Sequence, residues 1–283
     1  MTALARIGAL AALAALAACV PASEAAPPAG AYGFAIEPSP GARGEPIATT
    51  DGWTLRVEKL ALQVSVTAMS MATDRSSRNT FGSPENVRFD ASKSASVFSR
   101  AIAAGPATGT ITLQGEYLDQ GDHSRSRDDQ TEELGLPPEV SARFHAPADI
   151  SENDNGGSVS YSGPSMLLVL RAERSGRVVS LDLSFALYSG YDQQGQGPRD
   201  VVANELVSVP LTVRPEVLFE DEDSHQLRFD DFAAADANGD GLLSAHELET
   251  AGCNSCVPLG MAGYVPKLSE QIRSRGTRLF VNR

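Results

Sequence analysis

The sequence predicts a mainly β fold: an antiparallel β-sandwich with a C-terminal helical appendage. Several runs between residues 51 and 215 alternate apolar with polar or small side chains, the pattern of strands buried on one face. Gly, Pro and Asn residues separate these runs, as turns between short strands require. No strand–helix–strand rhythm occurs, which argues against a parallel α/β sheet.

The first long strand is expected from Trp53 onward, and its alternation changes phase part-way. The apolar positions are Trp53, Leu55 and Val57 in one phase, then Leu60, Leu62, Val64 and Val66 in the other. A slip of one residue moves every following side chain to the opposite face of a sheet. The pattern therefore predicts a β-bulge, or a bend between two strands, near residue 58.

Further strands follow from the same alternation. The stronger signals cover residues 108–117, 166–170, 179–187 and 206–213. Weaker candidates for strands cover residues 87–98 and 139–144. Antiparallel pairing of these runs would place their apolar faces in one core between two sheets.

The first residues have the layout of an export signal. One positive charge, at Arg6, precedes an Ala/Leu run over residues 7–18, which is shorter than the about 20 residues that span a membrane. The run ends in Leu16-Ala17-Ala18-Cys19, which resembles a bacterial lipobox. That resemblance implies cleavage before Cys19, acylation of its thiol and a membrane anchor in the bacterial cell envelope. Plain secretion after an Ala-x-Ala site is the competing interpretation.

The chain is therefore divided into four regions. Residues 1–18 are expected to be the lipoprotein signal peptide, and residues 19–49, rich in Ala, Pro and Gly, a flexible tether. An N-terminal strand near residues 32–36 is the alternative for part of that tether. Residues 50–215 form the predicted β-sandwich, and residues 216–283 the helical region.

Cysteine usage agrees with export. If Cys19 carries lipid, Cys253 and Cys256 remain, and an even pair in an oxidising compartment predicts a disulfide. A haem attachment site needs His after the second Cys, where Val257 stands. A zinc site needs two more ligands nearby, and none follows in the sequence. A thioredoxin-type motif needs a helix that starts after a strand, and this sequence context lacks one. We expect a small structural loop disulfide.

One stretch of the helical region carries a metal-binding pattern, Asp236-Ala-Asn238-Gly-Asp240-Gly241-Leu242-Leu-Ser244-Ala-His246-Glu247. It fits the calcium-loop pattern D-x-[DN]-x-[DN]-G-x5-E at every specified position. Calcium takes six to eight oxygens at about 2.3–2.6 Å, and Gly at the sixth position allows a sharp turn. The expected ligands are the side chains of Asp236, Asn238, Asp240, Ser244 and Glu247 and the carbonyl oxygen of Leu242.

This part of the chain, roughly residues 224–252, resembles an EF-hand. The resemblance implies a helix on each side of the loop. We expect Asp223 or Ser224 to cap the incoming helix and the outgoing helix to cover residues 245–251. A last helix is expected over residues 266–275. EF-hands usually come in pairs, and no second copy of the loop is present in this sequence.

Composition and motifs also restrict the function. A net charge of −13 argues against nucleic acid as a partner. No complete nucleophile, base or dinucleotide motif is present, so we expect no enzyme. We expect a calcium-binding lipoprotein of the cell envelope, with structural calcium and a sandwich that acts as a binding module, with an envelope protein as its candidate partner. The alternative is copper or iron handling, with Met69 and Met71 as soft ligands and calcium as a structural clip.

Overall fold

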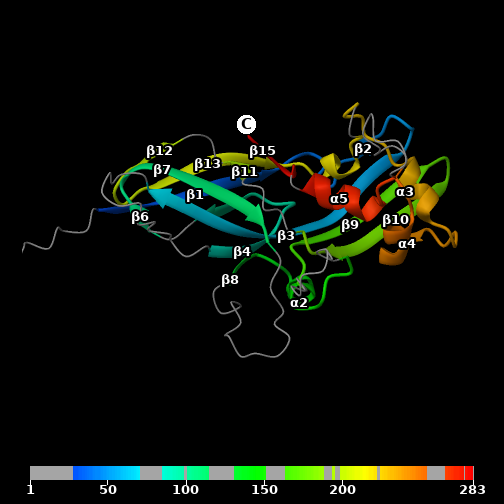
Figure 1. Ribbon diagram of the computed structural model, residues 1–283, viewed down its shortest axis with the longest axis horizontal. Helices are drawn as coiled ribbons and strands as arrows, with labels where there is room; N and C mark the ends of the chain where they lie inside the picture. The colour runs from blue at the N-terminus through cyan, green and yellow to red at the C-terminus, as the bar shows by residue number, and fades with distance from the viewer. Residues whose placement is uncertain are drawn as a thin grey trace, which may run out of the picture.

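A computed structural model describes residues 28–70, 85–98, 101–114, 131–150, 163–187, 193–194, 198–221, 224–253, 265–276 and 278–282. In these residues two β-sheets and a group of short helices surround one large hydrophobic core, and a second, smaller apolar cluster also forms. The helices α3, α4 and α5 gather toward one end of the molecule (Figure 1). The predicted mainly β fold with few helices is confirmed.

The smaller sheet begins with a strand in the stretch that we expected to be a tether. Its order is β15–β13–β1–β5, and β6 also pairs with β1. The members are β1 (Ala29–Pro38), β5 (Ala95–Phe98), β6 (Ile102–Ala103), β13 (Leu206–Val213) and β15 (Phe280–Asn282). The tether prediction for residues 19–49 is wrong over β1, since Tyr32, Phe34 and Ile36 are at most 1% exposed.

The small residues of β1 explain why this strand resembled a linker. A Cβ atom on Gly33 would lie 2.7 Å from the Cβ atom of Phe98, and one on Gly30 would lie 2.2 Å from the carbonyl oxygen of Val202. Glycine at these positions lets neighbouring backbone approach closely, rather than giving the chain flexibility. The alternative of an N-terminal strand near residues 32–36 is the correct one.

The larger sheet is built around one long strand, β3 (Thr54–Ser70). Its order is β11–β7–β3–β9–β10–β14, and four short strands pair beside this path. The other members are β2 (Ile47–Ala48), β4 (Glu85–Asp90), β7 (Gly105–Leu113), β8 (Thr131–Leu134), β9 (Met166–Arg174), β10 (Arg177–Phe185), β11 (Gln193–Gln194), β12 (Arg199–Val201) and β14 (Leu242–Leu243). The register of β3 against β9 shifts between Val57 and Lys59, which confirms the predicted bulge.

Most strand pairs are antiparallel, as expected, but both sheets are mixed, because three of the pairs are parallel. Parallel pairs join β1 to β13, β4 to β8 and β10 to β14. Alternation of side chains shows that a strand is buried on one face, but it carries no information about the direction of the neighbouring strand.

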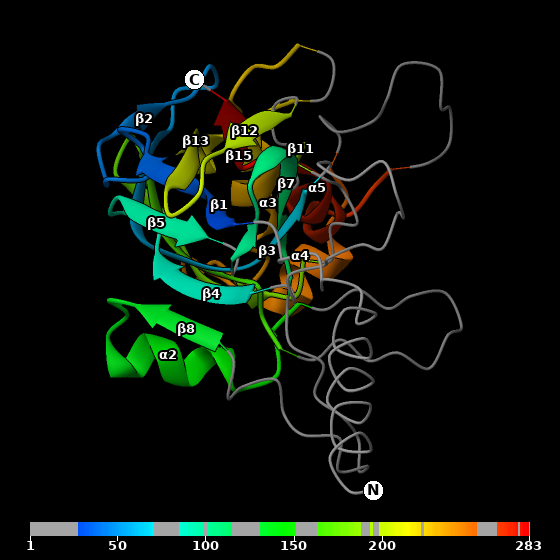
Figure 2. The ribbon, with the colours of Figure 1, turned by 90° about the vertical axis from the view of Figure 1, so that its left-hand side faces the viewer.

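Residues 139–144, a weaker strand candidate, belong to a helix, α2 (Pro138–Phe144). Pro138 stands in the first turn, where a missing N–H costs nothing. Val140 and Phe144 lie four residues apart on one face and pack with Ala61 and Leu167. The helix and β8 lie side by side next to β4 (Figure 2).

The C-terminal region is not a separate appendage. It contains η2 (Pro215–Phe219), α3 (Asp230–Ala235), α4 (Ala245–Thr250) and α5 (Leu268–Gly276), and it ends in β15, which pairs with β13. Phe219, Phe229 and Phe232 form a ring cluster that belongs to the same core as the two sheets. The division predicted at residue 216 therefore marks a change of secondary structure within one core.

Candidate calcium-binding loop

The predicted calcium loop lies between α3 and α4 and is docked on the edge of the larger sheet (Figure 1). Its central strand β14 pairs in parallel with β10, with Leu242 opposite Ser180 and Leu243 opposite Leu181. The amide of Ser180 donates to the carbonyl oxygen of Gly241 at 2.8 Å. The sheet edge thus supplies a backbone partner for the middle of the loop.

The first half of the loop is held by its own side-chain oxygens. Asn238 Oδ1 accepts from the amide of Asp240 at 2.8 Å, and Asp240 Oδ1 accepts from the amide of Leu242 at 2.7 Å. Asp236 Oδ1 lies 3.4 Å from the amide nitrogen of Gly241, which donates to it. In each contact a short side chain accepts a hydrogen bond from the backbone amide of a residue further along the chain. Such contacts form tight turns.

Gly241 has two roles in this loop. Its φ of +77° lies in the left-handed region, as the predicted sharp turn requires. In addition, a Cβ atom there would lie 2.9 Å from the carbonyl oxygen of Val178 on β10. The turn was predictable from the motif, whereas the close approach to the sheet was not.

The second half of the loop is a capped helix start. Ser244 is the N-cap of α4 and forms a capping box with Glu247. Glu247 Oε2 accepts from the amide and hydroxyl of Ser244 at 2.9 and 2.8 Å, and Oε1 accepts from the amide of Ala237 at 3.1 Å. Hydrogen bonds from the amide and hydroxyl of Ser244 lower the pKa of the Glu247 carboxyl, against the opposing effect of burial. The carboxylate therefore stays ionised and links the two ends of the loop.

The predicted ligands are only partly gathered. Asp236 and Glu247 are 9% and 8% exposed and lie at the two ends of the loop. The amide of Ala237, which follows Asp236, donates to Glu247 and so holds these ends together. Asn238 and Asp240 lie at the exposed tip, where Asn238 Nδ2 donates to Asp240 Oδ2 at 3.0 Å. Among the residues that the structure describes, no group of three or more His, Cys, Asp and Glu side chains is positioned to hold a metal ion. The donors are all oxygens and include two nearly buried carboxylates, which fits a hard cation such as calcium.

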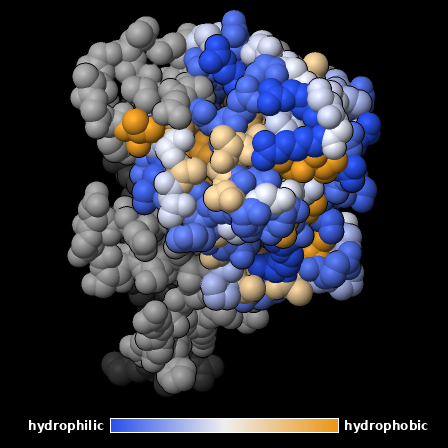
Figure 3. Space-filling view, turned by 90° about the vertical axis from the view of Figure 1, so that its right-hand side faces the viewer, coloured by the Kyte–Doolittle hydropathy of each residue, from blue (hydrophilic) through white to orange (hydrophobic). Residues whose placement is uncertain are grey.

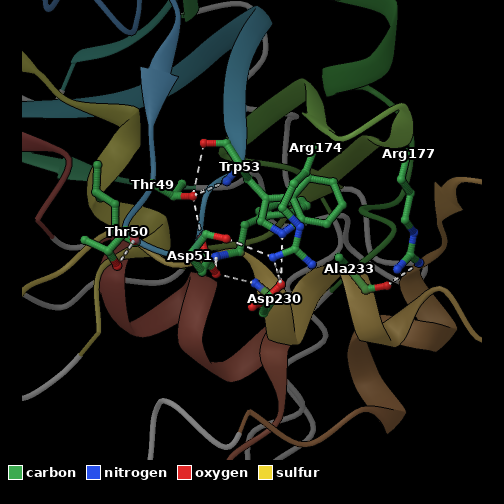
Figure 4. Close-up of polar contacts among 10 residues, drawn as sticks. Thr49, Thr50, Asp51, Trp53, Arg174, Arg177, Asp230 and Ala233 are labelled. Atoms are coloured by element: carbon green, nitrogen blue, oxygen red, sulfur yellow. Dashed lines mark hydrogen bonds and ion pairs between the residues drawn. The ribbon is translucent and has the colours of Figure 1, made fainter.

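Beside the loop lies a cluster of charged residues around the single Trp, which the sequence did not indicate (Figure 4). Asp51 Oδ2 accepts from the amides of Phe229 and Asp230, both at 2.7 Å. Asp51 therefore caps α3 from a distant part of the chain, and the predicted cap at Asp223 or Ser224 is wrong. Burial would raise the pKa of Asp51, but hydrogen bonds from the Thr49 hydroxyl and these amides together lower it.

Two arginines close this cluster over the indole ring. Arg174 lies 4.6 Å from the ring centroid of Trp53 and pairs with Asp230 Oδ1 at 2.6 Å, and Trp53 Nε1 donates to the same oxygen at 2.9 Å. Arg177 stands opposite Arg174 in the β9–β10 hairpin, and its Cζ atom is 6.0 Å from the same centroid. Arg177 Nη2 donates to the carbonyl oxygen of Ala233 at 2.7 Å and lies 3.3 Å from Asp236 Oδ2. Arg177 thus touches a predicted calcium ligand.

The other predicted sites are described in part. Cys253 is fully buried and disulfide-bonded, while Cys256 lies outside the described residues. Cys19 and the signal peptide lie outside them as well, as does Met71. Met69 pairs with Thr108 through the backbone of β3 and β7, and its side chain is not described. No helix in the described ranges is long and apolar enough to cross a membrane.

A second polar cluster surrounds Arg88, which is 1% exposed. Arg88 Nε donates to Gln63 Oε1 at 2.7 Å, and its Nη1 lies 3.3 Å from Glu133 Oε1 and 3.1 Å from His145 Nε2. Ser141 Oγ donates to that Glu133 oxygen. The guanidinium thus stands between His145 and the carboxylate, whereas a Ser–His–acid triad places the His between the other two groups. This arrangement compensates a buried charge and attaches β8 and α2 to the sheet.

No family model, curated protein or solved structure matches this chain. Functional inference therefore rests on the chemistry of the residues themselves. The loop is the site at which a complete sequence motif coincides with a tight turn and partly gathered oxygen donors.

Proposed function

We propose that this chain is a calcium-binding lipoprotein of the bacterial cell envelope in which calcium has a structural role. One observation carries the proposal: a segment that matches the twelve-residue calcium-loop pattern at every specified position lies on the sheet edge through β14, with Gly241 against Val178. An ion in this loop would connect α3, α4 and the sheet in one site.

The residues that would hold the ion are Asp236, Asn238, Asp240, Ser244 and Glu247 by side chain and Leu242 by its carbonyl oxygen. When bound, calcium supplies positive charge that compensates carboxylates which are otherwise costly to bury. Asp236 follows α3 directly, and Glu247 lies within α4. A loop that is not paired with a second EF-hand would bind in the weak range of about 10⁻⁴–10⁻³ M that is typical of extracellular modules.

The proposed membrane anchor is lipid on Cys19, supported by the lipobox-like sequence. Because β1 begins at Ala29, only residues 20–28 separate that Cys from the fold. Nine residues reach at most about 30 Å when fully extended. The β-sheets would then stay close to the lipid surface and present a binding surface to an envelope protein.

Thermal unfolding of the full chain in mild detergent, with calcium and with a chelator, tests the proposal. Calcium at 100 times its dissociation constant adds about 2.7 kcal/mol if it binds the folded state alone. For a chain of this size the melting temperature should rise by roughly 5–10 °C. The Asp236→Ala and Glu247→Gln variants should lose this rise.

The matched control is Asp200→Asn, which removes one carboxylate from an exposed position on β12. This variant should keep the full response to calcium. A wild-type chain whose melting temperature is the same in calcium and in chelator, and which binds no calcium in equilibrium dialysis, would refute the proposal.

A further inference from the structure

We propose that Arg177 is a built-in competitor for the calcium loop. Its guanidinium pairs with the first ligand, Asp236, and must release that carboxylate oxygen when a cation enters, so Arg177 sets the affinity of the site. The inference rests on the proposed calcium function and specifies how that site is regulated.

The pairing compensates a buried charge. The Asp236 side chain is 3% exposed, and the Arg177 side chain is 48% exposed. A carboxylate that is removed from water needs a partner charge or several hydrogen bonds. Arg177 provides that partner at 3.3 Å while its outer surface remains in water. The pair therefore stabilises the loop when no cation is bound.

The two oxygens of Asp236 have different partners, and this decides which one a cation would take. Oδ1 accepts from the amide of Gly241 at the sharp turn, and Oδ2 faces Arg177. The contact of Oδ1 helps to form the turn that the loop needs. The oxygen left for a metal ion is therefore Oδ2, the oxygen that Arg177 occupies.

Charge also opposes joint occupancy. Asp236, Asp240 and Glu247 together carry three negative charges, and a dication near Asp236 would lie close to the positive charge of Arg177. Like charges a few ångströms apart repel, more strongly beside a buried group than in water. Arg177 should therefore weaken binding even if its side chain moves only part of the way into solvent.

The hairpin keeps Arg177 in place. Arg177 begins β10, and Ser180 on the same strand is the residue on which the loop docks. Arg177 also donates to Ala233 at the end of α3 (Figure 4). The described face at this end of the molecule is hydrophilic with hydrophobic patches (Figure 3), and the Arg177 side chain is already 48% exposed, so a displaced guanidinium can turn into water. Competition thus involves rotation of one side chain rather than separation of the loop from the sheet.

Calcium titration calorimetry on the full chain in mild detergent tests the inference. Arg177→Gln should tighten calcium binding about tenfold, which corresponds to about 1.4 kcal/mol. Arg174→Gln is the matched control, because Arg174 also lies over Trp53 and pairs with a carboxylate, Asp230, that is not a predicted ligand. Its dissociation constant should stay within twofold of the wild-type value.

An Arg177→Gln chain whose affinity equals or falls below that of the wild type would overturn the inference and leave the calcium function standing. A wild-type chain that binds no calcium would instead refute the calcium function, and the inference with it. The two failures are therefore distinguishable in one titration series.

A second measurement uses the unaltered protein, in case Arg177→Gln does not fold. Phenylglyoxal modifies accessible guanidinium groups, and the modified residues can be located by mass spectrometry. Saturating calcium should speed modification of Arg177 several-fold and leave Arg174 unchanged. Equal rates at Arg177 with calcium and with chelator would show that the guanidinium is not released.

Discussion

The calcium loop and the tryptophan cluster beside it are built in opposite ways. Within the loop, the hydrogen bonds of Asp236, Asn238, Asp240 and Glu247 to other loop residues span at most ten positions. In the cluster, the bonds of Asp51 and Trp53 to Phe229 and Asp230 span 177–179 positions. The loop is therefore visible in the sequence as a motif, whereas the cluster exists only once the chain has folded.

This difference separates stability from binding. The cluster fixes α3 to the start of β3, and the loop holds the donors of the proposed calcium site. Arg177 connects them, because it lies near Trp53 and also touches Asp236. Damage to the cluster should lower the free energy of unfolding with little change in calcium affinity, and damage to loop ligands should do the reverse.

The largest effect is expected for Trp53→Ala. The ring is 1% exposed and packs edge-on against Phe229 with centroids 5.4 Å apart. Truncation of a buried large aromatic residue costs about 3–5 kcal/mol of unfolding free energy. Urea unfolding should show that loss equally with calcium and with chelator. Trp53→Phe, the control, should retain most of the packing. A loss confined to calcium-loaded protein would break the distinction between cluster and loop.

A pair of glycines separates docking from local strain. Gly239 and Gly241 have φ values of +72° and +77°. A Cβ atom on Gly239 would have no neighbour within 4 Å, whereas one on Gly241 would lie 2.9 Å from the carbonyl oxygen of Val178. Gly239→Ala should cost about 1 kcal/mol through backbone strain. Gly241→Ala should cost about 2–3 kcal/mol, because strain and the clash with β10 add. Urea unfolding of both variants in chelator measures the difference. Equal costs would mean that the loop moves away from the sheet without penalty.

Much of the fold follows from the sequence, because alternation and its phase are local properties. The run over residues 206–213 coincides with β13, and the phase slip after Val57 coincides with the bulge. The main prediction from the sequence is a tether where β1 lies, because Gly30 and Gly33 interrupt the apolar pattern of this strand. These glycines serve contacts with Val202 and Phe98, which are invisible before the sheet is assembled.

The site shows the same limit. The ligands of the proposed calcium site could be named from the sequence, since the motif places all of their oxygens within twelve positions. Neither the cap that Asp51 provides to α3 nor the pairing of Arg177 with Asp236 leaves a local signal. Asp51 follows a short strand and precedes β3, so its sequence context indicates a turn. Side chains that act across the core become recognisable only through contacts between distant segments.

An effect as small as that of Gly239→Ala, but one that depends on pH, is expected for Asp51→Asn. An Asn keeps one acceptor but loses the charge that favours the two helix amides, so the change should cost about 1 kcal/mol near neutral pH. Because the folded pKa of Asp51 is lowered, its contribution is complete above the ordinary carboxyl value and is lost as pH falls through the folded value. Urea midpoints of wild type and Asp51→Asn should therefore converge at acidic pH, whereas Asp200→Asn should show little difference near neutral pH. A difference in urea midpoint between wild type and Asp51→Asn that stays constant at acidic pH would mean that Asp51 caps α3 without its charge.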